Sequence, residues 1–115
     1  MAGMTRDMIL NFAQEQSWTA RALMVERAAT LLVDGALDEA ERQTAIDLFR
    51  LARYDGEPLV RRMLAESLKH ARELPPDIVR ALARDIPEVS APFLAASPLI
   101  ADDDLFAIAQ GGAGV

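Results

Sequence analysis

The chain has 115 residues, a formal net charge of −6 at pH 7 and no cysteine. This length suits a single domain over residues 1–115. Without cysteine there are no disulfides, thiol nucleophiles or thiolate metal ligands, and the acidic balance argues against nucleic acid, whose binding requires a basic surface. No stretch approaches the ~20 apolar residues of a membrane-spanning helix, and the N-terminus lacks the apolar run of a signal peptide. We therefore expect a cytoplasmic protein without membrane contact.

The composition favours helix over strand. The 21 alanines and 15 leucines are strong helix formers, whereas valine, isoleucine and threonine together number only 16. Turn formers followed by helix-start residues divide the chain into short segments. The predicted helices, in chain order, cover residues 5–14, 17–32, 38–53, 58–71, 76–84, 87–96 and 102–110.

Local signals mark the starts of several of these helices. Ser17 is a predicted N-cap, and Asp38 with Glu41 has the spacing of a capping box. Pro58 suits a first helical turn, because the N–H that it lacks has no helical partner there. Pro92 lies inside the sixth segment, where we expect it to kink the helix or to force a restart.

Apolar residues at spacings of three and four indicate which helix faces are buried. The predicted stripes on the second, third and fourth helices are Trp18, Ala22, Val25, Ala29 and Leu32; Ala45, Ile46, Phe49 and Ala52; and Leu59/Val60, Met63/Leu64, Ser67/Leu68 and Ala71. We expect Trp18 to join Met4, Met8 and Met24 in an N-terminal core. The alternative is an exposed apolar edge for self-association, a surface to which methionine is suited.

Two segments of the chain resemble each other. Leu-Ala-Arg at 51–53 precedes Asp55 and Pro-x-Val at 58–60, and Leu-Ala-Arg-Asp at 82–85 precedes Pro-x-Val at 87–89. A second register aligns Leu74–Ala83 with Ile100–Ala109, so the two periods are 29 and 26 residues. A pair of short helices cannot bury its own apolar faces, whereas stacked pairs can. The pattern predicts a HEAT-like α-α superhelix of about seven short helices in antiparallel pairs, the alternative being a generic helical bundle.

Residues 66–85, 88–100 and 103–105 also resemble a bacterial HEAT-like family catalogued as domain of unknown function 2336. The resemblance covers roughly residues 10–110 and is most specific at Leu-Pro-Pro-Asp, 74–77, and in the Ala-Pro-x-Leu-x-x-Ser-Pro-Leu run that follows. It implies an all-helical repeat fold in a bacterial cytosolic protein and carries over no catalytic residue. Because members of the family are often longer, it also implies that this chain is the N-terminal part of a longer protein.

The chain contains no recognisable catalytic or metal-binding pattern. His70 is the single histidine and suits the C-terminal end of the fourth helix. Asp102, Asp103 and Asp104 suit a helix start better than a calcium loop, because no EF-hand spacing follows them. No motif brings together two of the scattered acids Asp7, Glu15, Glu26, Asp47 and Glu66. We therefore expect neither an enzyme nor a bound cofactor or metal.

Charge is unevenly distributed along the chain. Residues 50–84 contain eight cations against five acids, a balance of +3, which leaves −9 for the remainder. The predicted partner-binding residues on this basic face are Arg61, Arg62, Lys69 and Arg72. We expect a non-catalytic protein-interaction or regulatory scaffold that binds an acidic protein segment or forms a homodimer. A signalling domain that binds a small anionic ligand such as a nucleotide is the alternative, and a solvated face with an Arg62–Glu66 pair is the plainest reading.

Overall fold

The computed structural model describes residues 4–100, which form six α-helices and no strand. The helices are α1 (Asp7–Gln14), α2 (Trp18–Val33), α3 (Glu39–Ala52), α4 (Pro58–Leu68), α5 (Pro76–Ala83) and α6 (Pro87–Ala96). The all-helical prediction is confirmed for this part of the chain, whereas the seventh predicted helix, 102–110, lies outside it. Within residues 4–100 no helix is long and apolar enough to cross a membrane.

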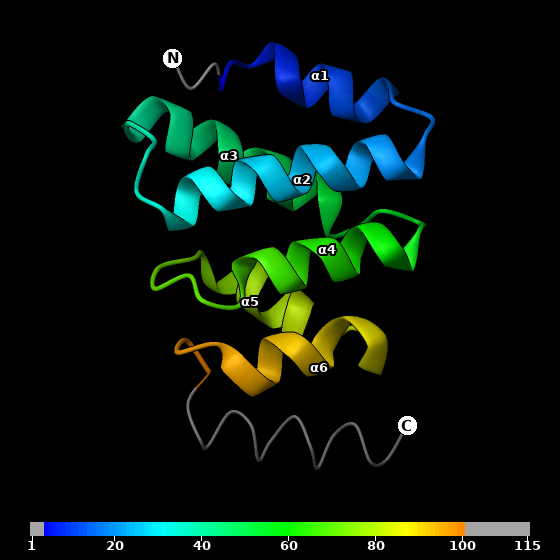
Figure 1. Cartoon of the computed structure of the whole chain (residues 1–115), viewed down its shortest axis with the longest axis vertical. Helices are drawn as coiled ribbons and strands as arrows, with labels where there is room; N and C mark the ends of the chain where they lie inside the picture. Colours follow the sequence, from blue (N-terminus) through cyan, green and yellow to red (C-terminus); the bar gives the residue numbers. More distant parts are fainter. Residues whose placement is uncertain (1–3, 101–115) are drawn as a thin grey trace.

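Helices α2, α4 and α6 form one layer, in which α4 packs against both of the others. Figure 1 shows these three helices one below another, each starting at the right-hand edge, with α3 and α5 behind them. In the second layer α1 packs against α3, and the two layers meet where α3 contacts α2 and α4 and where α5 contacts α6. The connections into α2, α4 and α6 therefore share one edge of the molecule (Figure 1).

The core lies between the two layers and includes most residues of the predicted stripes, except that Leu59 and Trp18 are exposed and Leu48, which no stripe contained, is fully buried. The largest fully buried side chains are Phe49, Phe93, Leu48, Leu64, Leu68, Ile78, Leu82, Val25, Val60 and Val89. Small residues contribute to this core, since Ala28 and Ala29 of α2 and Ala65 of α4 are fully buried, and small side chains allow packed helices to approach closely. The α2/α4/α6 layer is thus held by apolar packing along the whole of α4.

The predicted N-cap at Ser17 and the predicted capping box at Asp38 are confirmed. The Ser17 hydroxyl accepts a hydrogen bond from the Ala20 N–H at 3.3 Å, as an N-cap does. The Asp38 carboxylate accepts from the Glu41 N–H at 2.8 Å, and the Glu41 carboxylate accepts from the Asp38 N–H at 3.1 Å, which completes the capping box.

The end of α4 differs from the prediction. The helix ends at Leu68, and Lys69 and His70 form a turn, whereas the apolar spacing had extended the helix to Ala71. Ala71 is nevertheless buried, because the turn folds it back onto the core, where its N–H donates to the Leu68 carbonyl at 3.0 Å. Burial therefore continues past the helix, and the spacing of buried residues alone could not reveal where the helix stops.

Two further predictions need correction. Pro92 does not force a restart, since α6 runs from Pro87 to Ala96 as one element. Trp18 is not a core residue: 42% of its surface is exposed, because it is the first residue of α2 and lies at the edge of the packed region. The methionine part of that prediction holds, since Met4 is buried and Met8 and Met24 pack partly buried against the core.

Candidate interaction surface

The Arg61 guanidinium forms three hydrogen bonds within the molecule. Its Nε and Nη2 donate to the two carboxylate oxygens of Asp85, at 2.8 and 3.2 Å, and its Nη1 donates to the Asp55 carbonyl at 2.6 Å. The Arg61 side chain is only 17% exposed, and the hydrogen bonds that it donates to the Asp85 carboxylate raise its pKa. These contacts fix Arg61 within the fold and leave little of its side chain exposed.

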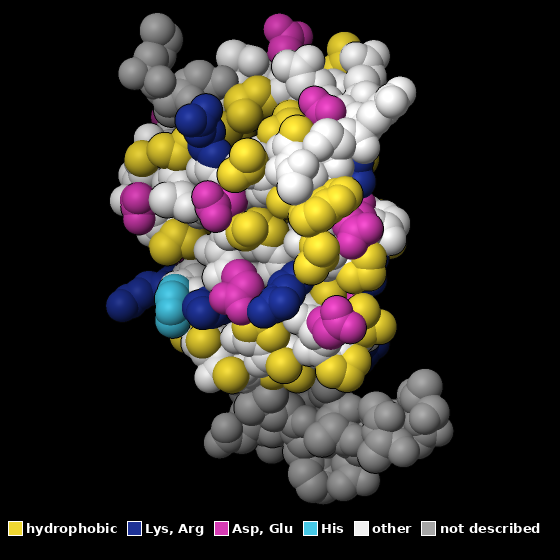
Figure 2. Space-filling view, turned by 45° about the vertical axis from the view of Figure 1, so that its right-hand side comes forward, with side chains coloured by type: hydrophobic (Ala, Val, Ile, Leu, Met, Phe, Trp, Pro, Cys, Tyr) yellow, Lys and Arg dark blue, Asp and Glu magenta, His cyan; other side chains and the backbone are white. Residues whose placement is uncertain are grey.

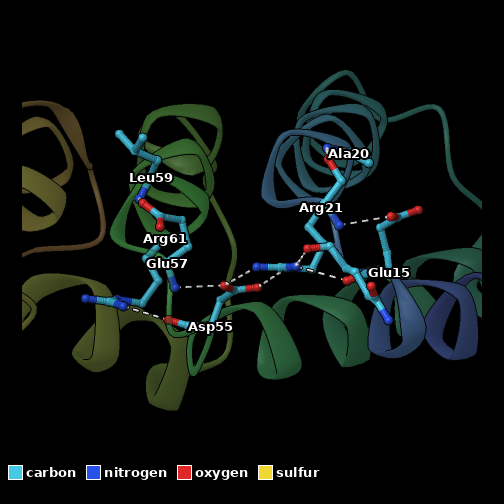
Figure 3. A network of polar contacts seen from close by, with 9 residues as sticks. Glu15, Ala20, Arg21, Asp55, Glu57, Leu59 and Arg61 are labelled. Atoms are coloured by element: carbon cyan, nitrogen blue, oxygen red, sulfur yellow. Dashed lines mark hydrogen bonds and ion pairs between the residues drawn. The ribbon is translucent and has the colours of Figure 1, made fainter.

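Arg21 of α2 makes the same kinds of contact as Arg61 of α4, the next helix in the same layer (Figure 3). Its Nε and Nη2 donate to the Asp55 carboxylate at 2.7 and 3.0 Å, and its Nη1 donates to the Glu15 carbonyl at 2.9 Å. Arg21 and Arg61 are each the fourth residue of their helix, and each bonds a carbonyl six residues earlier in the chain. Each arginine also reaches the aspartate in the loop that leads to the next helix of the layer.

The other three predicted partner-binding residues differ from Arg61 in their surroundings. Lys69 forms an ion pair with Glu66 at 3.1 Å, so Glu66 is taken by Lys69 and not by Arg62. Arg62 is exposed on α4 and has no ion pair with any residue in 4–100. Arg72 is also exposed, but it follows the end of α4 and does not share a helical face with Arg62. Figure 2 shows basic and acidic side chains mixed on this side of the molecule, next to the histidine.

A shallow depression lies at the opposite end of α4 from Arg61. It has a volume of about 620 Å³ and is lined by His70, Arg72, Ala96, Pro98 and Leu99. The structure thus brings one predicted residue, Arg72, next to the single histidine. The partner-binding role of the four residues stays a prediction, and of these four Arg62 and Arg72 remain free of ion pairs within residues 4–100.

Ion pairs also join the helices of the second layer. Arg6 Nη1 lies 2.6 Å from Asp47 of α3, and Arg50 and Arg53 in the last part of α3 both reach Asp77 at the start of α5. The hydrogen bond from Arg6 lowers the pKa of Asp47, and the hydrogen bond from Arg50 lowers the pKa of Asp77. Both aspartates are therefore held in their charged form at neutral pH.

Sequence reasoning overlooked Arg80 and Arg84 as candidate site residues. Both side chains are exposed, and neither has an ion-pair partner within the part of the chain that the structure describes. A signal was present in the sequence, because Asp77-x-x-Arg80 repeats the spacing of Asp47-x-x-Arg50 thirty residues earlier. The Leu-Ala-Arg repeat already pairs Arg53 with Arg84, but it does not extend back to the Asp47–Arg50 and Asp77–Arg80 spacing.

The acids do not form a metal site within residues 4–100, where no group of three or more histidine and carboxylate side chains gathers. Asp47 is bound to Arg6 and Glu66 to Lys69. The acidic run at 102–104, predicted to start a helix, lies outside the described residues.

No family model matches the chain, and no curated protein and no solved structure matches it either. The resemblance to domain of unknown function 2336 therefore stays a prediction from the sequence.

Proposed function

We propose that this chain is a non-catalytic scaffold, built of HEAT-like helix pairs, that binds an acidic segment of a partner protein. The pairs we propose are α3 with α4 and α5 with α6, which are in contact, and α1 with α2, which are consecutive in the chain. The observation that supports this most directly is the matched bonding of Arg21 and Arg61, which hold successive pairs by the same contacts. Recurring contacts between successive units are typical of repeat proteins, which use extended surfaces to bind other proteins.

The exposed side of the α2/α4/α6 layer is the surface we assign to the partner. It carries Arg62, which is exposed and unpaired within residues 4–100, and the exposed apolar side chains of Leu23 and Leu59. Arginine beside exposed leucine offers a partner both a charge and apolar area, and arginine is enriched in the residues that dominate interface energies. An acidic segment with apolar residues has the complementary chemistry.

A photo-crosslinking experiment tests this proposal. A photoreactive residue is placed at Arg62, and a matched one at Ala40, which is exposed on α3 in the other layer. In cells that make the protein, position 62 should capture a defined protein and position 40 should not. With the purified partner, Arg62→Glu should then weaken binding about tenfold or more. Absence of any captured protein that is specific to position 62 would sink the proposal.

A second candidate is the binding of a small anion in the depression beside Arg72. The observation that favours it is the pairing of His70 and Arg72 along one rim of this space. A panel of nucleotides and polyphosphates should then raise the melting temperature of the chain, and Arg72→Ala should abolish the rise. If no anion in the panel shifts the melting temperature, this candidate is eliminated.

A further inference from the structure

Every polar atom of Asp55 takes part in a hydrogen bond. Its carboxylate accepts from Arg21 Nε at 2.7 Å, from Arg21 Nη2 at 3.0 Å and from the Glu57 N–H at 3.0 Å. Its own N–H donates to the Ala52 carbonyl at 3.0 Å, and its carbonyl accepts from Arg61 Nη1 at 2.6 Å. Only 6% of the Asp55 side chain is exposed. Asp55 is therefore a fixed junction between α2, the end of α3 and α4.

Arg61 continues this connection to α6. Its Nη1 donates to the Asp55 carbonyl, while its Nε and Nη2 donate to the two carboxylate oxygens of Asp85. Asp85 Oδ1 also accepts from the N–H of Ile86, the N-cap of α6, at 2.7 Å. Because a guanidinium is planar and rigid, its three nitrogens move together. A shift of the Asp55 carbonyl would thus tilt the guanidinium and disturb its parallel hydrogen bonds with Asp85.

The other end of the connection lies in the loop before α2. Arg21 Nη1 donates to the carbonyls of Glu15 and Gln16 at 2.9 and 3.1 Å. An unbroken series of hydrogen bonds therefore runs from this loop through the first turns of α2 and α4 to the start of α6. Figure 3 shows the middle of the series, with Arg21 and Arg61 on opposite sides of Asp55.

We propose that the series Arg21–Asp55–Arg61–Asp85 is a conformational relay, which makes the starts of α2, α4 and α6 open as one unit. Arg21 acts in it as a positioning residue for the Arg61–Asp85 contact, which it does not touch. The four side chains are each less than 20% exposed, so water is a poor substitute for a lost partner, and a break at one joint weakens the next. The relay belongs to the fold and does not depend on the proposed partner.

Amide hydrogen exchange of the full chain, followed by NMR, tests the relay. The probe is the N–H of Ile86, bonded to Asp85, and the reference is the N–H of Arg42, which donates to the Asp38 carbonyl at the opposite edge. Arg21→Ala should raise the ratio of the Ile86 rate to the Arg42 rate by at least about threefold. Arg21→Lys, which keeps the charge but loses the planar fork, should raise the same ratio and serves where the alanine variant does not fold.

Arg27→Gly is the matched control. Arg27 is an exposed arginine in the middle of α2 with no ion pair within residues 4–100. Glycine destabilises a helix interior, so this variant loosens α2 and removes a cation without touching the relay. It should lower the melting temperature and leave the ratio of the two exchange rates unchanged. A ratio that rises as much as in Arg21→Ala would overturn the proposal.

The apolar packing of α2 on α4 is a second route by which a disturbance at Arg21 could spread, and Arg61→Lys separates the two routes. Lysine keeps the charge but cannot bond the Asp55 carbonyl and both Asp85 oxygens from one plane. Through the relay, Arg21→Ala should add little to the Ile86 exchange rate once Arg61→Lys is present. Through packing, Arg21→Ala would speed Ile86 by the same factor in both backgrounds, and the relay would be rejected.

Faster exchange confined to residues 53–60 in both Arg21 variants would also contradict the relay, because the disturbance would then stop at the first joint. The crosslinking at Arg62 does not depend on amide exchange at the start of α6. The relay can therefore fail while the scaffold proposal stands, and the reverse holds as well.

Discussion

The Arg61 guanidinium lies side by side with the Asp85 carboxylate, bonded at 2.8 and 3.2 Å, although the two residues are 24 positions apart in the chain. The contact joins α4 to the loop that leads into α6. Asp85 also accepts a hydrogen bond from the Ile86 N–H at 2.7 Å, so one carboxylate organises both the loop and the approach of α4. Long-range pairs of this kind act together with the apolar packing of α4 to hold the helices in place.

Asp85→Asn should destabilise the chain, because it removes the charge that compensates the largely buried Arg61 while preserving an oxygen for the Ile86 N–H. We expect the free energy of unfolding to fall by about 1–3 kcal/mol in urea titrations. Asp34→Asn is the matched control, since Asp34 is exposed and has no ion pair within residues 4–100, and it should change stability by less than about 0.5 kcal/mol. Equal effects of the two substitutions would contradict a structural role for the Arg61–Asp85 pair.

Acid should weaken the second layer through Asp47 and Asp77. Their pKa values are lowered in the folded state by Arg6 and Arg50 respectively, so the stabilisation is present above the unfolded pKa and is lost as the pH falls through the folded pKa. The melting temperature should therefore drop below about pH 4. Between pH 6 and pH 3, the fall in melting temperature should be roughly 1–4 °C smaller for Asp77→Asn than for the unaltered chain. Asp7→Asn is the control and should leave that fall unchanged. An unchanged pH profile in Asp77→Asn would argue against the pairing.

Gly35 should be sensitive to substitution and Gly56 should not. Gly35 has a φ of +71°, a left-handed conformation that strains any residue with a Cβ, whereas the φ of Gly56 is not positive. No atom lies within 4 Å of a Cβ built at either position, so crowding is absent and only the backbone differs. Gly35→Ala should cost about 1–2 kcal/mol in thermal or urea unfolding, while Gly56→Ala should be neutral or slightly stabilising. Equal losses at both positions would be inconsistent with the turn geometry.

Trp18 provides a spectroscopic check of the edge of the layer. It is the only tryptophan, and 42% of its surface is exposed. Its emission in the folded chain should lie at long wavelength and should be quenched by acrylamide at no less than about half the rate seen in the unfolded chain. The opposite observation, a blue-shifted and protected Trp18, would mean that this edge is covered in solution, as a homodimer would cover it.

How much of this molecule was accessible from sequence depends on the range of each interaction. The caps at Ser17 and Asp38 could be predicted because each involves residues three positions apart. The burial of Phe49 and Leu64 followed from helical periodicity. The end of α4 could not be predicted, because Ala71 is buried outside the helix.

The same distinction applies to the candidate interaction surface. Arg61 looks like a surface cation in the sequence, and only the fold brings Asp85 to it. Lys69 pairs with Glu66 three positions earlier, a local contact that the sequence contains but that competes with the alternative Arg62–Glu66 pair. The partner-binding role of these residues stays a prediction, and among the residues described Arg62 and Arg72 are free of ion pairs whereas Arg61 and Lys69 are paired.

The placement of the arginine–aspartate contacts has a consequence for the loops. Loop 53–57 contains Asp55, which both Arg21 and Arg61 contact, one through the carboxylate and the other through the carbonyl. A residue inserted there would displace Asp55 from both Arg21 of α2 and Arg61 of α4. Loops 34–38 and 69–75 lie on the opposite edge and hold no such double contact within the described residues. Inserted sequence, including an affinity tag or a fused domain, should therefore be tolerated best at that opposite edge between the exposed residues Arg72 and Glu73, away from Gly35, Asp38 and the buried Ala71.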